Sequence, residues 1–130
     1  MRRLAIIGAS GHGKVIADIA KRIGYCEIVF FDDDESIHEC GGYPVVGKSS
    51  EAGTLDADVI VGIGNAAVRK RILEAIPDEK LVTLIHPNAV IGENVHMENI
   101  VMDRYAKVTR VKSVAAPADN PGYIKRKDVM

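Results

Sequence analysis

A glycine-rich turn between an apolar strand and an amphipathic helix is the feature that most constrains the fold of this chain. Residues 4–7 are apolar, and the helix after the turn places isoleucine and alanine side chains on one face. The N-terminus of such a helix presents backbone N–H groups and a positive dipole end to an anion. Glycines are needed because a Cβ would hold the ligand away from the backbone. The sequence therefore predicts a nucleotide-binding unit with glycines at Gly8, Gly11 and Gly13.

The spacing of this turn differs from the two best-known phosphate-binding motifs. Ala9 and Ser10 follow Gly8, so the turn does not match the G-x-G-x-x-G pattern of dinucleotide-binding proteins. Gly8 to Lys14 does match G-x-x-x-x-G-K, but Val15 occupies the position where a P-loop needs a hydroxyl for magnesium. We therefore expect neither an NTPase nor a bound metal ion.

The composition argues against several classes of function. With 17 basic and 18 acidic residues, the chain has no excess charge to attract nucleic acid or an anionic membrane. It contains neither an apolar run of membrane-spanning length nor the long apolar region of a signal peptide. Cys26 and Cys40 are isolated thiols without metal-ligand spacing, which fits a reducing compartment. We expect a cytoplasmic protein without nucleic-acid or membrane partners.

Apolar strands alternate with helices as far as residue 85. This pattern is typical of a parallel sheet that is covered by helices on both faces. We predict an α/β fold with a Rossmann-like sheet, with strands at 4–7, 27–31, 57–63 and 80–85, a short edge strand at 43–47, and helices at 13–23 and 66–76. Gly24 is expected to end the first helix, and Pro77 to stop the second.

Glycine-rich or acidic segments follow three of these strands. The carboxyl ends of parallel strands meet at one edge of a sheet, and open α/β sheets bind their ligands there. The glycine turn, the acidic pair Asp32 and Asp33, and residues 62–65 are therefore expected to form one site. The alternative is that the glycines only make turns and the aspartates only face water.

Beyond the last predicted strand the pattern changes to a six-residue period. Apolar residues such as Val95 and Val101 are spaced six apart, which is typical of a left-handed parallel β-helix. Residues 87–102 make about one coil, which must pack on the preceding domain at 1–86 or on another chain, because one coil cannot bury its own apolar face. Residues 103–130 are interpreted as a basic C-terminal tail.

Four short motifs follow one another along the chain. G-A-S-G-H-G occupies Gly8 to Gly13, F-F-D-D ends at Asp33, and L-I-H-P-N-A begins at Leu84. Before the last of these, Gly62 begins G-I-G-N-A-A-V-R-K-R-I. In this order the motifs resemble those of the hexapeptide-repeat sugar acyltransferases, in the branch that acetylates UDP-amino-sugars or sialic acid.

The resemblance implies a role for each part of the chain. In that family the N-terminal domain binds the nucleotide-sugar, and a β-helix trimer binds acetyl-CoA between neighbouring subunits. The family's catalytic histidine belongs to a later coil than the one that holds His96, so no catalytic residue is assigned here. We expect a UDP-sugar-binding domain that is inactive alone because most of the β-helix is missing. We expect no bound cofactor, no acetyl-CoA site, and a monomer or homodimer.

The predicted site combines these segments with the histidine of the last motif. Lys14 is disfavoured by the helix dipole unless a pyrophosphate is bound, and Asp32 and Asp33 are assigned to the ribose or uracil. His12 contacts the ligand or shapes its loop, and Asn65 contacts the ligand or caps its helix. The predicted substrate-binding residues are Gly8, Ser10, Gly11, His12, Gly13, Lys14, Asp32, Asp33, Gly64, Asn65 and His86.

Two other functions stay open at this point. The same crevice can hold NAD in an oxidoreductase or a sensor domain, although the glycine spacing argues against a dinucleotide. The chain can also act as a scaffold that assembles with a complete partner subunit.

Overall fold

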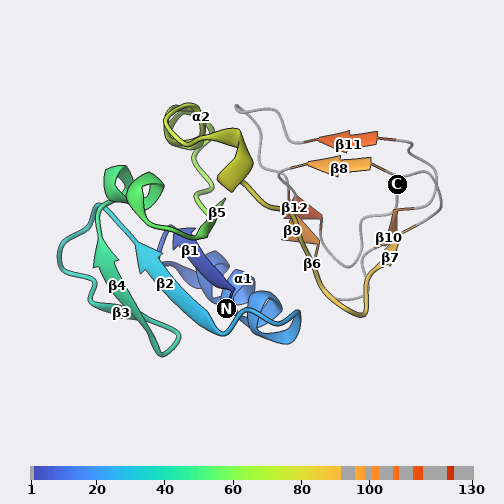
Figure 1. Ribbon diagram of the computed structural model, residues 1–130, viewed down its shortest axis with the longest axis horizontal. Helices are drawn as coiled ribbons and strands as arrows, with labels where there is room; N and C mark the ends of the chain where they lie inside the picture. The colour runs from blue at the N-terminus through green and yellow to red at the C-terminus, as the bar shows by residue number, and fades with distance from the viewer. Residues whose placement is uncertain are drawn as a thin grey trace.

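The first part of the chain forms a five-stranded sheet. The computed structural model describes residues 2–91, 96–98, 101–102, 107–108, 113–115 and 123–124. The strand order is β3-β4-β2-β1-β5 (Figure 1). The strands are β1 (Arg3–Ile7), β2 (Glu27–Phe31), β3 (Glu39–Cys40), β4 (Tyr43–Gly47) and β5 (Asp58–Val61). β4, β2, β1 and β5 run parallel, and β3 forms an antiparallel hairpin with β4.

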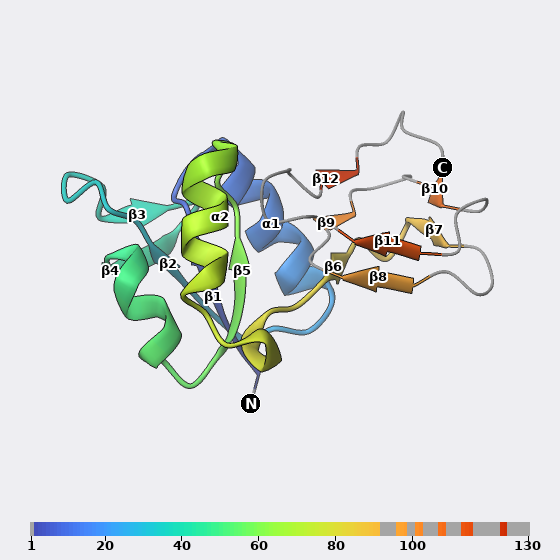
Figure 2. The same cartoon turned by 90° about the horizontal axis from the view of Figure 1, so that it is seen from above.

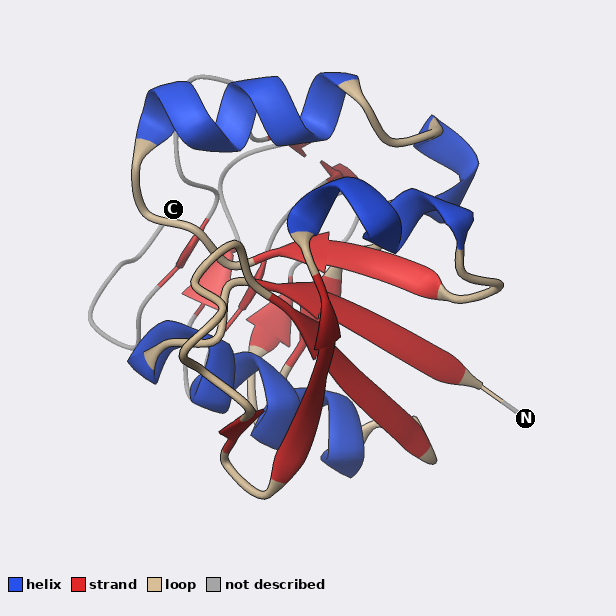
Figure 3. Ribbon diagram, turned by 90° about the vertical axis from the view of Figure 1, so that its left-hand side faces the viewer, coloured by secondary structure: helices blue, strands red, loops and turns tan. Residues whose placement is uncertain are grey.

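Apolar cores lie on both faces of the sheet because alternate residues of a strand point in opposite directions. Leu4 packs into the core that contains α1 (Gly11–Arg22). Ile7 packs into the core formed with η1 (Ser49–Thr54) and α2 (Ala66–Glu74). Figure 3 shows α1 on one side of the sheet and α2 with η1 on the other. The predicted Rossmann-like sheet with helices on both faces is confirmed.

The end of α1 follows the expected glycine motif. Ile23 is the C-cap, and Gly24 adopts a φ of +107°. The Gly24 N–H donates to the Lys21 carbonyl over 3.3 Å, and the Tyr25 N–H donates to the Ala20 carbonyl over 3.0 Å. These two bonds make a Schellman motif, which needs a left-handed residue and explains the glycine.

The strand that we predicted at residues 80–85 is much shorter. Lys80, the first residue of the predicted strand, belongs instead to the single helical turn η2 (Asp78–Lys80). Leu81 makes one isolated parallel bridge to Val59. The strand β6 covers only Leu84–Ile85, and it belongs to a different sheet. The prediction was wrong because the chain leaves the first sheet here and leads into the second part.

The second part of the chain consists of short parallel strands. β6 joins β9 (Val101–Met102) and β12 (Tyr123–Ile124) in one small sheet. β7 (Val90–Ile91) pairs with β10 (Lys107–Val108), and β8 (His96–Glu98) pairs with β11 (Ser113–Ala115). Strands from the segment that was interpreted as a tail therefore stack in parallel on the first coil. Val95, one of the predicted six-residue positions, lies outside the described residues.

The coil packs against α1. Leu84 and Val101 are buried, and they belong to the same apolar core as Ile16, Ile19 and Ala20 of α1. Figure 2 shows β6 and β9 next to α1. The preceding domain therefore covers this side of the coil, which is one of the two arrangements that the sequence predicted. Among the helices of the described part, none is both long and apolar enough to cross a bilayer.

Candidate functional site

The three segments predicted to form a site meet at the carboxyl edge of the sheet. The Gly8 N–H donates to the Phe31 carbonyl over 2.8 Å, so the glycine turn is fixed against the end of β2. The Gly62 N–H donates to the Ile7 carbonyl over 2.8 Å, which fixes the segment after β5 against the end of β1. The loops after β1, β2 and β5 therefore share one edge, where α/β sheets bind ligands.

The glycines of the turn differ in their surroundings. Gly8 has a φ of +110°, and a Cβ there would lie 3.0 Å from the Gly62 carbonyl oxygen. A Cβ on Gly13 would lie 2.8 Å from the Phe30 ring and still closer to the Gly8 carbonyl. Around Gly11, no atom lies within 4 Å of the Cβ position. Gly8 therefore allows the turn to lie close to the segment after β5, Gly13 allows α1 to pack closely on the sheet, and Gly11 faces open space.

The N-terminus of α1 is not capped by its own side chains. Ser10 is the N-cap residue but makes no capping hydrogen bond, and the first turn contains no acidic side chain. The Lys14 N–H is the first to reach a backbone carbonyl, that of Ser10, over 3.0 Å. A helix leaves the N–H groups before this point without intrahelical acceptors. Beside the open space at Gly11, these donors can bind a phosphate.

Lys14 and the β3–β4 hairpin lie side by side at this helix end. A Cβ on Gly41, which has a φ of +59°, would lie 3.4 Å from the Lys14 Cγ. Cys40 is buried beside them, its Sγ donates to the Ser10 carbonyl over 3.5 Å, and burial raises the pKa of its thiol. The contact between the hairpin and the turn was not predicted from the sequence. The pair Gly41 and Gly42 was the available signal.

The acidic residues after β2 use their carboxylates to bind backbone N–H groups of neighbouring loops. One oxygen of Asp32 accepts the Ala9 N–H and the other accepts the Asp34 N–H, each over 2.8 Å. Asp33 accepts the N–H and the hydroxyl of Ser49 over 2.9 and 2.8 Å. These bonds, first from the Ser49 backbone and then from its side chain, lower the pKa of Asp33. Contact with a ribose or uracil stays a prediction for both residues.

The two predicted histidines lie at different places. His12 is half-buried between the glycine turn and β5, with its Cδ2 3.8 Å from the Cβ position of Gly62. His86 is buried where the chain enters the coil, and its Nδ1 accepts the Asn88 N–H over 3.0 Å. His86 therefore shapes its own turn, and its contact with a substrate stays a prediction.

The segment after β5 positions α2. Asn65 is its N-cap, because the side-chain oxygen accepts the Val68 N–H over 3.0 Å. Gly64 is exposed, with no atom within 4 Å of its Cβ position. Arg69, which the sequence analysis did not single out, is buried and donates to the Val61 carbonyl over 2.7 Å. Burial lowers the pKa of this guanidinium, and the bond attaches α2 to the end of β5.

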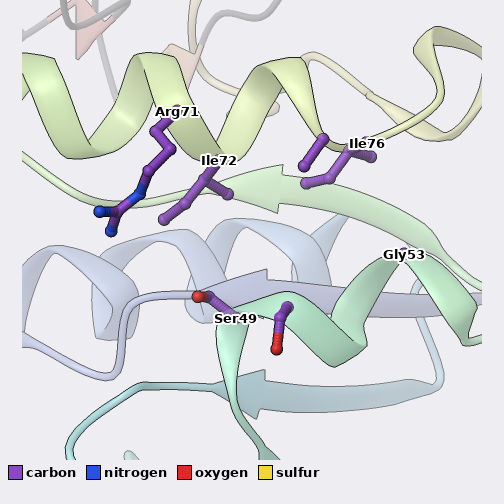
Figure 4. A pocket seen from close by; sticks show the side chains of 7 residues that line it. Ser49, Gly53, Arg71, Ile72 and Ile76 are labelled. Atoms are coloured by element: carbon purple, nitrogen blue, oxygen red, sulfur yellow. The ribbon is translucent and has the colours of Figure 1, made fainter.

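Two cavities lie beside the sheet. One of about 350 Å³ is lined by Asp32, by the loop that follows it and by the end of β4. The other, of about 140 Å³, lies between η1 and α2, and Figure 4 shows Ile72 and Ile76 on its α2 side with Ser49 on its η1 side. The residues that line the smaller cavity include none of the predicted site residues. Of the predicted site residues, Asp32 alone lines the larger cavity.

Comparison with known proteins identifies the family. Residues 3–76 match the model of the PglD N-terminal domain. The chain belongs to the PglD N-terminal domain family. This match contains all the predicted site residues except His86. Together with the acetyltransferases described next, it confirms the resemblance to sugar acetyltransferases.

Individual relatives of the family agree with this match. The UDP-N-acetylbacillosamine N-acetyltransferase of Bacillus subtilis (strain 168) is 31% identical over 102 residues, which is 72% of this chain and 47% of that protein. The acetyltransferase domain of PglB from Neisseria gonorrhoeae FA1090, solved with acetyl coenzyme A, is 34% identical with a TM-score of 0.76. That match covers 88% of this chain and 58% of the other. The chain spans about half the length of the curated relative.

A more distant solved structure shares the fold of this PglD-type domain. PerB from Caulobacter crescentus, in complex with CoA and GDP-perosamine, is 24% identical with a TM-score of 0.72. The match covers 88% of this chain and 56% of that protein. At this identity the likeness supports the α/β fold followed by parallel coils.

Proposed function

We propose that this chain binds a UDP-sugar as the substrate-binding domain of a sugar N-acetyltransferase. The observation that carries the proposal is the uncapped N-terminus of α1, which adjoins open space at Gly11. A pyrophosphate is the anion that fits such a helix end in an α/β crevice. It would also offset the unfavourable position of Lys14 in the first helical turn.

The nucleoside is proposed to extend toward the loop after β2. The cavity of about 350 Å³ begins at Asp32 and combines apolar walls at Ile37 and Val45 with polar groups. Cavities of this size and mixed lining suit a small planar ligand. Uridine is preferred to guanosine because the curated relative is named for a UDP-sugar, and that relative exceeds 30% identity.

A thermal-shift panel of UDP, UDP-N-acetylglucosamine, NAD and CoA tests this function. A ligand at a hundredfold excess over its Kd stabilises a protein by about 2.7 kcal/mol, which shifts the melting midpoint by several degrees. We expect UDP and the UDP-sugar to stabilise the chain more than NAD does. A stronger response to NAD would favour the oxidoreductase or sensor alternative.

Replacing Gly11 by valine tests the position of the pyrophosphate. The new side chain would occupy the open space beside the helix end and should weaken UDP at least tenfold, or about 1.4 kcal/mol. Gly53→Val is the matched control, because the nearest atom to its Cβ position is 4.0 Å away and it lies outside the proposed site. Isothermal titration calorimetry on both folded variants measures the UDP affinity of each. Unchanged UDP affinity in Gly11→Val would contradict the proposed position of the pyrophosphate.

A further inference from the structure

We propose that Asp32 is a positioning residue, whose carboxylate fixes the shape of the glycine turn and joins it to the next loop. The inference rests on the proposed nucleotide site and refines it. In dinucleotide-binding folds an acidic residue at this place holds a ribose hydroxyl. In this chain Asp32 instead contacts the glycine turn, where the phosphate is proposed to bind.

The Asp32 side chain holds the backbone of the glycine turn where it leaves β1. The Gly8 N–H donates to the Phe31 carbonyl over 2.8 Å, as in a regular parallel ladder. The next N–H, that of Ala9, donates to the Asp32 Oδ2 over 2.8 Å. In a regular strand this N–H would face away from β2, but the φ of +110° at Gly8 turns the backbone here. The carboxylate therefore holds the turned backbone in place before any ligand arrives.

The other contacts of Asp32 attach this arrangement to two further segments. Its Oδ1 accepts the Asp34 N–H over 2.8 Å, which orders the loop after β2. Its own N–H donates to the Gly47 carbonyl at the end of β4 over 3.0 Å. Hydrogen bonds to a charged acceptor are stronger than those between neutral groups. One half-buried residue thus links the turn, its own loop and β4.

The neighbouring carboxylates have other partners. Asp33 binds Ser49 at the start of η1, and Asp34 accepts the N–H and the hydroxyl of Ser36 over 3.0 and 2.6 Å. These bonds organise the loops around the larger cavity, whereas the bond from Asp32 reaches the glycine turn. Because the Ala9 N–H donates to Asp32, an anion at the turn would bind the N–H groups in the first turn of α1. Losing Asp32 should therefore weaken the binding of any phosphate, with or without a nucleoside.

Amide hydrogen exchange, followed by NMR on the full chain, tests the positioning without a ligand. In Asp32→Ala the Ala9 amide should exchange at least about tenfold faster, while the Gly8 amide, bonded to a backbone carbonyl, should not change. Glu39→Ala is the matched control, because Glu39 also accepts a loop N–H, that of Gly42, over 2.9 Å. It should accelerate Gly42 and leave Ala9 unchanged. An unchanged Ala9 amide in Asp32→Ala would overturn the proposal.

Calorimetry with inorganic pyrophosphate and with UDP provides the second readout. Positioning predicts that Asp32→Ala weakens both ligands by a similar factor, about tenfold. Loss of UDP affinity with unchanged pyrophosphate affinity would make Asp32 a ribose ligand and overturn the proposal. If the wild-type chain binds neither ligand, the proposed function fails, while hydrogen exchange still decides the role of Asp32.

A conservative variant covers the case in which Asp32→Ala does not fold. Asp32→Asn keeps one acceptor oxygen for two N–H groups. Either the Ala9 or the Asp34 amide should then exchange faster than in the wild type. Unchanged exchange at both amides would contradict the proposed bonds.

Discussion

Replacing Gly13 by alanine should destabilise the fold, although alanine is the better helix former. The added Cβ would lie 2.8 Å from the Phe30 ring and still closer to the Gly8 carbonyl oxygen. Neither group can move easily, because Phe30 is fully buried and the Gly8 N–H is bonded to the end of β2. The start of α1 would have to shift away from β1, which would disturb the apolar contacts that the helix makes with the sheet.

The expected magnitude follows from two opposing terms. Overpacking a well-filled core costs about 1 to 3 kcal/mol, and the upper end applies here because one of the contacts is backbone. Alanine regains up to about 1 kcal/mol over glycine in a helix. The net loss is about 2 kcal/mol, which lowers the melting midpoint of a domain of this size by roughly 6 to 10 °C.

Gly11 provides the control for this measurement. It lies two residues earlier in the same helix, and no atom lies within 4 Å of its Cβ position. Gly11→Ala should therefore be neutral or stabilising, by up to about 1 kcal/mol. Urea unfolding followed by circular dichroism measures both variants. Equal free energies of unfolding for Gly11→Ala and Gly13→Ala would refute the reasoning, because the turn would then yield without cost.

Two further substitutions test polar contacts away from the turn. Tyr25→Phe removes the 2.7 Å hydrogen bond to Asp58 and should cost about 1 to 2 kcal/mol in urea unfolding at neutral pH. Because burial and that bond raise the pKa of Tyr25 from 10.0 to about 12, this stabilisation is complete below pH 10 and is lost as the pH rises through 12. The difference between wild type and variant should shrink over that range, and a constant difference would count against it. Arg69→Met removes the donor to the Val61 carbonyl and should cost about 1 to 3 kcal/mol in thermal melts. Lys70→Met, at the exposed next position, should change stability by less than about 0.5 kcal/mol, and equal losses would contradict the role of Arg69.

The elements that could be predicted from the sequence are those whose signals are local. β2 has the predicted bounds because the four residues after Glu27 are β-branched or aromatic and all buried, which favours a strand. Gly24 ends α1 and Asn65 caps α2, since each of these roles depends on one residue type within one helical turn. The meeting of three loops at one edge followed from the parallel order of the strands.

The features that could not be predicted depend on distances set by the whole fold. Asp32 and Asp33 are adjacent acids in the sequence, yet one binds the glycine turn and the other binds Ser49. Their partners are 23 and 16 residues away, and no local pattern encodes such a choice. The pairing of the strands in 107–124 could not be predicted for a related reason. They pair with strands that lie 17 to 22 residues earlier in the chain. These separations are not multiples of six, so a search for an even six-residue period does not find the strands.

The glycine pattern itself combines two requirements that a sequence cannot separate. Gly8 and Gly13 are needed by the fold, since a side chain at either would collide with backbone or with Phe30. Gly11 meets no such limit, and its helical position would accept alanine at no structural cost. A ligand that approaches the backbone would account for a glycine at this position, because any Cβ would hold that ligand away. We therefore predict that a ligand approaches the backbone at Gly11, whichever nucleotide that ligand carries, and Gly11→Val is the variant that tests it.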